Sequence, residues 1–88
     1  MIAQFNRFSI EMTMAQAQNA THSGVCDNDV KALLKDRKIQ RQLNKIDPNL
    51  ISLELKEYGA WDSKELLDTE ANKGRIVWIA AGNIIDNR

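Results

Sequence analysis

The chain has 88 residues, of which 43% are hydrophobic and 27% are charged. This length predicts a single domain over residues 1–88, and the composition excludes wholesale disorder. The 12 basic residues balance the 12 acidic ones, so the net charge gives no overall attraction to nucleic acid or to an anionic membrane.

The single cysteine, Cys26, cannot form an internal disulfide, and the chain does not start with the basic and apolar residues of a signal peptide. The longest strongly apolar stretch covers residues 76–81, whereas a membrane-spanning helix needs about 20 apolar residues. We therefore expect a cytoplasmic protein that makes no contact with a membrane.

Residues 1–12 follow two patterns at once. Phe8, Ile10 and Met12 alternate with polar residues, which is the pattern of a short strand. Phe5, Phe8 and Met12 also follow the spacing of a helix. A lone strand would need a partner that the sequence does not clearly supply, so we expect an extended N-terminal arm, with a short strand as the alternative.

Capping signals mark the first two helices. Thr13 and Gln16 form the pattern of a capping box, which predicts a helix over residues 14–22. We expect this helix to end at Ser23-Gly24, because glycine commonly follows the last residue of a helix. Asp27 is the expected N-cap of the second helix.

The apolar stripe of the second helix loses its phase after Leu34, because the next apolar residue is Ile39, five positions later. One continuous helix would turn such a residue away from the buried face. A break near Asp36, which is itself a suitable N-cap, restores the pattern. We therefore expect a separate helix over residues 37–45.

A fourth helix has a clear start and a clear end. Asp47 is a capping residue that stands directly before Pro48, and proline is favoured at the first position of a helix. Ile46 and Ile51 stand at the two positions of a hydrophobic staple. Gly59 ends the helix, because glycine readily takes a left-handed conformation.

Asp62 and Glu65 form another capping box, and we expect the last helix to run from about residue 63 to residue 85. Its second half, residues 76–85, is apolar almost all round, which is typical of a buried central helix. The alternative is a turn followed by a buried strand over residues 75–80, because short apolar runs do not distinguish the two.

Together these elements predict an all-α fold. We expect a small bundle of four or five short helices packed around residues 76–85, with the extended arm at the N-terminus.

The sequence contains no pattern that indicates catalysis, and we expect neither an enzyme nor a cofactor. His22 and Cys26 are too few for a closed zinc site, which needs four ligands. Glu54 and Glu57 form a carboxylate pair, but we expect both to face solvent, where nothing raises a pKa toward neutrality.

The neutral total hides two charged segments. Residues 31–45 carry a net charge of +5, and residues 47–70 carry a net charge of −5. The six bases of the first segment are Lys31, Lys35, Arg37, Lys38, Arg41 and Lys45. They could contact a partner, including a phosphate backbone, or the two segments could partly neutralise each other within the fold.

The aromatic residues have different expected roles. Trp78 lies in the apolar helix and is expected in the core. Tyr58 and Trp61 flank a junction between two helices, where Trp61 can act as a hydrophobic staple. The alternative is that both contact a partner, because Tyr and Trp are enriched in binding hot spots.

Several stretches resemble a group of small uncharacterised proteins from bacterial genomes, prophages and plasmids. These stretches are MTMAQA at residues 12–17, the region of residues 22–30, ELKEYGAWD at residues 54–62, Glu65-Leu66, and IVWIAAGNI at residues 76–84. The resemblance implies the setting of a mobile element, where small cytosolic proteins often bind a host or defence protein. It transfers no catalytic or binding residue.

The sequence therefore predicts a small non-enzymatic interaction protein of bacterial or mobile-element origin that binds a protein partner. The alternative is an accessory protein that contacts nucleic acid through residues 31–45. We also expect a homodimer, because a small chain with an all-round apolar helix gains stability by burying that helix in a second copy.

Overall fold

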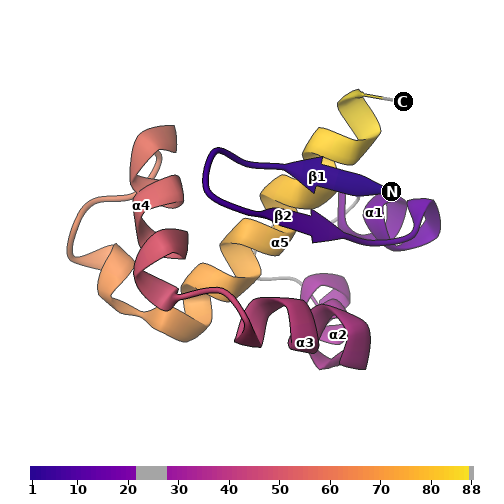
Figure 1. The fold of residues 1–88 in the computed structure, drawn as a ribbon, viewed down its shortest axis with the longest axis horizontal. Helices are drawn as coiled ribbons and strands as arrows, with labels where there is room; N and C mark the ends of the chain where they lie inside the picture. Colours follow the sequence, from indigo (N-terminus) through magenta and orange to yellow (C-terminus); the bar gives the residue numbers. More distant parts are fainter. Residues whose placement is uncertain (22–27, 88) are drawn as a thin grey trace.

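In the computed structural model, the long C-terminal helix runs through the middle of the molecule and the other elements pack around it (Figure 1). The structure describes residues 1–21 and 28–87. In chain order the elements are β1 (Ile2–Gln4), β2 (Ser9–Glu11), α1 (Met14–Thr21), α2 (Asn28–Lys35), α3 (Arg37–Asn44), α4 (Pro48–Tyr58), the short 3-10 turn η1 (Glu65–Leu67) and α5 (Thr69–Asp86). The predicted helical class is confirmed, with five α-helices among the described residues.

Helix α5 is the buried central element, as the sequence predicts. Its fully buried apolar side chains are Ile76, Val77, Ala80, Ala81 and Ile84. The chain is helical throughout this region, so the alternative strand over residues 75–80 is wrong. Trp78 is only half-buried, although it packs against the core as expected.

The expected start of this helix is wrong by six residues. Asp62 and Glu65 exchange both hydrogen bonds of the capping box, at 2.8 and 3.2 Å, but they open only η1. The backbone is then extended at Asp68, whose carboxylate accepts from the N–H of Ala71 (3.1 Å) and starts α5. The sequence holds two capping aspartates six residues apart, and both act as caps.

The N-terminal arm is a β-hairpin that packs against α5. β1 and β2 are antiparallel, with Ala3 opposite Ile10. Both of these side chains are buried and face the core. The alternating pattern near Ile10 therefore does mark a strand, and its partner is the preceding segment, which the sequence analysis did not identify.

The capping motifs of the shorter helices are confirmed. Thr13 and Gln16 exchange hydrogen bonds at the start of α1, and Asp36 separates α2 from α3 by accepting from the N–H of Ile39 (3.1 Å). Asp47 accepts from the N–H of Asn49 (2.8 Å) at the start of α4. The predicted end of α1 at residues 22–24 and the cap at residue 27 lie outside the described residues.

Helix α4 ends as expected at Gly59, which has a φ of 72°. This backbone conformation is strained for residues with a side chain, and glycine accepts it freely. The turn sends the chain toward η1 and then into α5.

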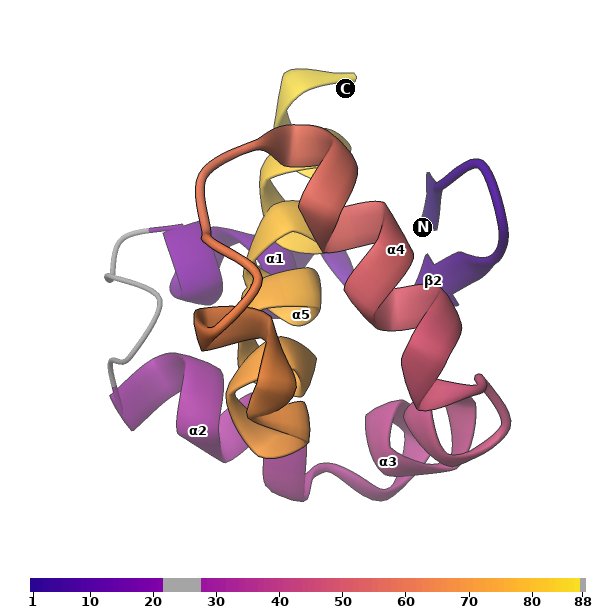
Figure 2. The same cartoon turned by 90° about the vertical axis from the view of Figure 1, so that its left-hand side faces the viewer.

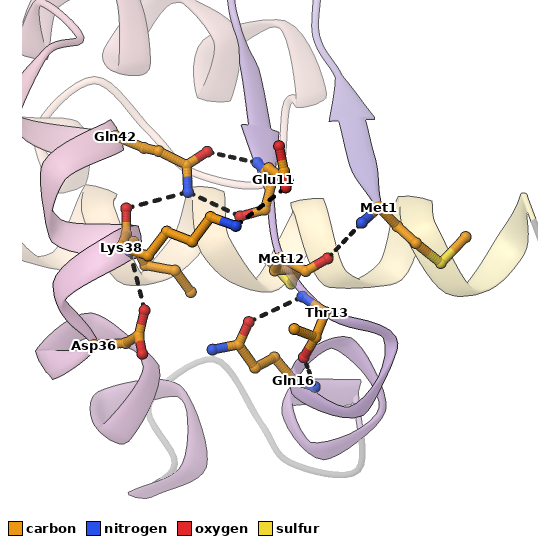
Figure 3. Close-up of polar contacts among 9 residues, drawn as sticks. Met1, Glu11, Met12, Thr13, Gln16, Asp36, Lys38 and Gln42 are labelled. Carbon is orange, nitrogen blue, oxygen red and sulfur yellow. Dashed lines mark hydrogen bonds and ion pairs between the residues drawn. The ribbon is translucent and has the colours of Figure 1, made fainter.

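A side chain of α3 completes the outer edge of the hairpin (Figure 3). The Glu11 N–H donates to Oε1 of Gln42 (2.6 Å), and Nε2 of Gln42 donates back to the Glu11 carbonyl (2.8 Å). Lys38 adds an ion pair with the Glu11 carboxylate at 3.2 Å. Gln42 thus makes the pair of backbone contacts that a neighbouring strand would make.

Replacing Asp68 with alanine should lower the free energy of unfolding by about 1 kcal/mol, the typical value for a lost N-cap. Asp62→Ala should cost less, because its carboxylate accepts only from the Glu65 N–H at the start of the three-residue turn η1. Chemical denaturation of the two variants and the wild type measures both losses. A larger loss for Asp62→Ala would place the effective start of the long helix at the earlier cap.

Gln42→Ala should lower the free energy of unfolding by about 1 kcal/mol, because it removes both hydrogen bonds to the Glu11 backbone. Gln40→Ala is the matched control, since Gln40 is exposed on the same helix and the structure shows no hydrogen bond from its side chain. Its effect should stay within roughly 0.5 kcal/mol. Equal losses in thermal or chemical denaturation would contradict the role given to Gln42.

Candidate functional site

Helices α2 and α3 lie together at the end of the molecule opposite the C-terminus (Figure 1 and Figure 2). All six bases predicted as partner contacts are exposed there. Lys31 and Lys35 are spaced i, i+4 on one face of α2. Arg37, Arg41 and Lys45 follow the same spacing along α3 and the residue after it.

Five of these six bases have no ion pair with any residue that the structure describes. Lys38 is the exception, because it pairs with Glu11. We define the remaining five as the basic surface: Lys31, Lys35, Arg37, Arg41 and Lys45.

The acids of residues 47–70 are engaged elsewhere. Asp47 and Asp68 cap helices, and Asp62 exchanges the hydrogen bonds of a capping box with Glu65. Glu70 pairs with Lys73 at 3.2 Å. Within the described ranges, no ion pair therefore joins the acidic segment to the basic one, and the two do not neutralise each other by direct contact.

The remaining two acids hold the turn of the hairpin against α4. Glu54 is 2% exposed, and its Oε1 accepts from the Arg7 backbone N–H (2.8 Å) and from the Arg7 guanidinium (3.0 Å). The guanidinium also contacts Glu57 at 2.8 Å. The expectation that both carboxylates face solvent is wrong for Glu54, because a residue 47 positions earlier covers it.

This cluster changes two pKa values. Hydrogen bonds to Glu57 and then to Glu54 raise the pKa of Arg7 above its ordinary value. Hydrogen bonds from Arg7 and then from Asn6 lower the pKa of Glu57. Arg7 therefore pairs with both carboxylates and links the hairpin turn to α4.

Tyr58 and Trp61 have separate surroundings. Tyr58 is 48% exposed and lines a hollow of about 190 Å³ with the hairpin residues Gln4, Phe5 and Asn6. Trp61 is half-buried against the core, and the Arg75 guanidinium lies 5.3 Å from its ring centre. Tyr58 is therefore the more accessible of the two predicted contacts.

The residues that the structure describes contain no group of three or more metal-ligating side chains placed to hold an ion. The pair considered from the sequence, His22 and Cys26, lies outside those residues. None of the described helices is long and apolar enough to cross a membrane.

The sequence analysis did not identify two features of this region. One is the contact of Arg7 with Glu54, for which the sequence offers no signal because the residues are far apart in the chain. The other is a furrow beside the basic surface, formed by two adjoining hollows that share Leu34 and Glu70. It depends on the tertiary placement of α5 against α2.

Glu57 should make the stability depend on pH in the acidic range. Its pKa in the folded state is below the ordinary value of 4.5, so the unfolded chain takes up the proton first as the pH falls. The contribution of Glu57 is complete above about pH 4.5 and is lost as the pH falls through the folded pKa. Denaturation curves recorded from pH 7 to pH 3 give the free energy of unfolding. As the pH falls, this free energy should lose the contribution of Glu57 in the wild type, whereas Glu57→Gln should show no such loss. The same pH dependence of the free energy of unfolding in the wild type and in Glu57→Gln would contradict this role of Glu57.

Comparisons of the chain with protein-family models, with curated proteins and with solved structures gave no match.

Proposed function

We propose that this chain is a small non-enzymatic interaction protein that binds an acidic protein partner through the basic surface. The observation that carries the proposal is that five neighbouring bases are exposed and have no ion pair within the described chain. The acids that could have neutralised them cap helices or pair with other bases.

Exposed, unpaired bases suit this role for a physical reason. They keep their hydration in the free protein, so they add little to its stability and remain available to a partner. A cluster of one sign attracts an opposite charge over about one Debye length, roughly 8 Å at physiological salt. Such attraction raises the rate of association and favours partners of the matching sign.

Nucleic acid is the second candidate, and one observation favours it. Arg37, Arg41 and Lys45 lie along one line of about 12 Å, given a rise of 1.5 Å per residue, and could contact a phosphate backbone. Two features count against it. Residues 31–45 contain no aromatic side chain that could stack on bases. A single residue separates α2 from α3, whereas a helix-turn-helix motif has a turn of about 3–4 residues.

The proposal places the protein in the cytoplasm, with a bacterial or mobile-element origin. The resemblance of residues 54–62 and 76–84 to small bacterial, prophage and plasmid proteins supports this setting. A homodimer remains a prediction. The apolar half of α5, on which that prediction was based, is covered by other elements of the same chain.

The double variant Arg37→Glu and Arg41→Glu tests the basic surface. Wild-type protein should bind poly-glutamate at low salt and lose affinity as the salt rises. The variant should bind at least about tenfold more weakly, because it removes two attractions and adds two repulsions. Titration by fluorescence anisotropy measures the affinities.

Lys56→Glu with Lys64→Glu is the matched control. Both lysines are exposed and lie outside the basic surface, and the structure shows no ion pair for either. This control should keep the wild-type affinity. Equal losses in both double variants would show that only the total charge matters. Tighter binding to duplex DNA than to poly-glutamate would favour the second candidate.

A further inference from the structure

The furrow beside the basic surface runs between the start of α5 and the pair α2 and α3. Figure 2 shows α2 beside the first turns of α5. The hollow between α2 and α5 has a volume of about 250 Å³ and is lined in part by Val30, Ala71 and Gly74. The hollow toward α3 has a volume of about 230 Å³. Both are lined by Leu34 and Glu70, so the two hollows lie side by side, and we call them together the furrow.

The hollow between α2 and α5 has a mainly apolar lining, whereas the hollow toward α3 is lined mostly by the polar residues Gln40, Asn44, Glu70 and Lys73. Val30 and Leu43 are buried core residues, while Leu34 and Ala71 are half-buried and keep part of their surface open. Each hollow is smaller than a typical site for a small molecule, which takes up about 300–1,000 Å³. The size suits a bulky apolar side chain from a partner.

Bases surround these hollows. Lys31 and Arg75 line the hollow next to α2, and Lys73 lines the hollow next to α3. Arg37 and Arg41 stand three positions before Gln40 and Asn44, which line the same side of the furrow, so they lie next to these residues on α3. Glu70 is the one acid among the lining residues of the two hollows, and Lys73 holds it at 3.2 Å.

We propose that the furrow binds an acidic protein segment that carries bulky apolar side chains. The carboxylates of the segment contact Lys31, Lys35 and the two arginines of α3, and one apolar side chain enters the furrow against Leu34 and Ala71. This inference rests on the proposed function and adds the chemistry of the partner. The charges select an anionic segment, and the apolar lining of the hollow next to α2 selects one with a side chain to bury.

A nucleic-acid backbone fits the furrow less well than such a segment. It brings no aliphatic side chain to cover Leu34 and Ala71. Nucleic acid is therefore an outcome that the test must separate from the proposal.

The test uses two synthetic peptides and one variant that fills the furrow. The first peptide is acidic with two leucines at i, i+4, and the second has serines in place of the leucines. Ala71→Phe fills the furrow and leaves every charge in place. Ala15→Phe is the matched control, because Ala15 is exposed on α1 and does not line either hollow of the furrow. Circular dichroism checks that both variants fold.

We expect wild-type protein and Ala15→Phe to bind the leucine peptide about tenfold more tightly than the serine peptide. A tenfold preference corresponds to about 1.4 kcal/mol. In Ala71→Phe the preference should disappear, while the weaker electrostatic binding of both peptides persists. The double variant Arg37→Glu with Arg41→Glu should bind both peptides more weakly and should still prefer the leucine peptide to the serine peptide.

If Ala71→Phe does not fold, the amide chemical shifts of wild-type Leu34, Ala71 and Gly74 provide the test. At saturation, they should move further with the leucine peptide than with the serine peptide. Equal affinity of wild-type protein for the two peptides would overturn the furrow proposal and leave the proposed function standing. Binding of duplex DNA with no binding of either peptide would overturn both. Self-association that Ala71→Phe abolishes would make a second copy the occupant and would also overturn the proposal.

Discussion

The fold depends on burial against α5, because no other element has enough residues to be stable alone. Helices α1, α2 and α3 have eight residues each, and isolated helices shorter than about 12–15 residues are marginal in water. The hairpin has two three-residue strands and depends on a packing surface in the same way. Helix α1 packs against α5, and both helices bury small side chains, Ala17 and Ala20 in α1 and Ala80 and Ala81 in α5.

Charge has different uses at the two ends of the molecule. Around α4, η1 and the start of α5, acidic side chains satisfy helix N-termini or pair with bases such as Arg7. On α2 and α3, the bases make few contacts within the chain. Replacing a side chain that caps a helix or forms an ion pair lowers the stability of the fold. Replacing an unpaired surface charge has little effect on stability. The basic surface is therefore the part of the charge pattern that folding does not explain.

Features that depend on neighbouring residues could be predicted from the sequence, and features that depend on distant residues could not. The side chains of Thr13, Asp36 and Asp47 each accept from a backbone N–H that lies two or three residues further along the chain. Local sequence patterns were therefore sufficient to predict these caps. The strand partner of Ser9–Glu11 and the burial of Glu54 require tertiary contacts that no local pattern records. For the candidate site, exposure of the bases was predictable, but the absence of acidic partners among the described residues and the presence of the furrow depend on tertiary contacts.

The contact of Gln42 with Glu11 has a consequence for the behaviour of the chain at high concentration. A free strand edge can pair with another chain and begin a growing cross-β aggregate. Here a carboxamide from α3 already occupies the N–H and C=O of Glu11 that such a neighbour would use. Growth from that side of the hairpin would first have to pull α3 away from β2, and this requirement protects the folded protein against aggregation through that edge.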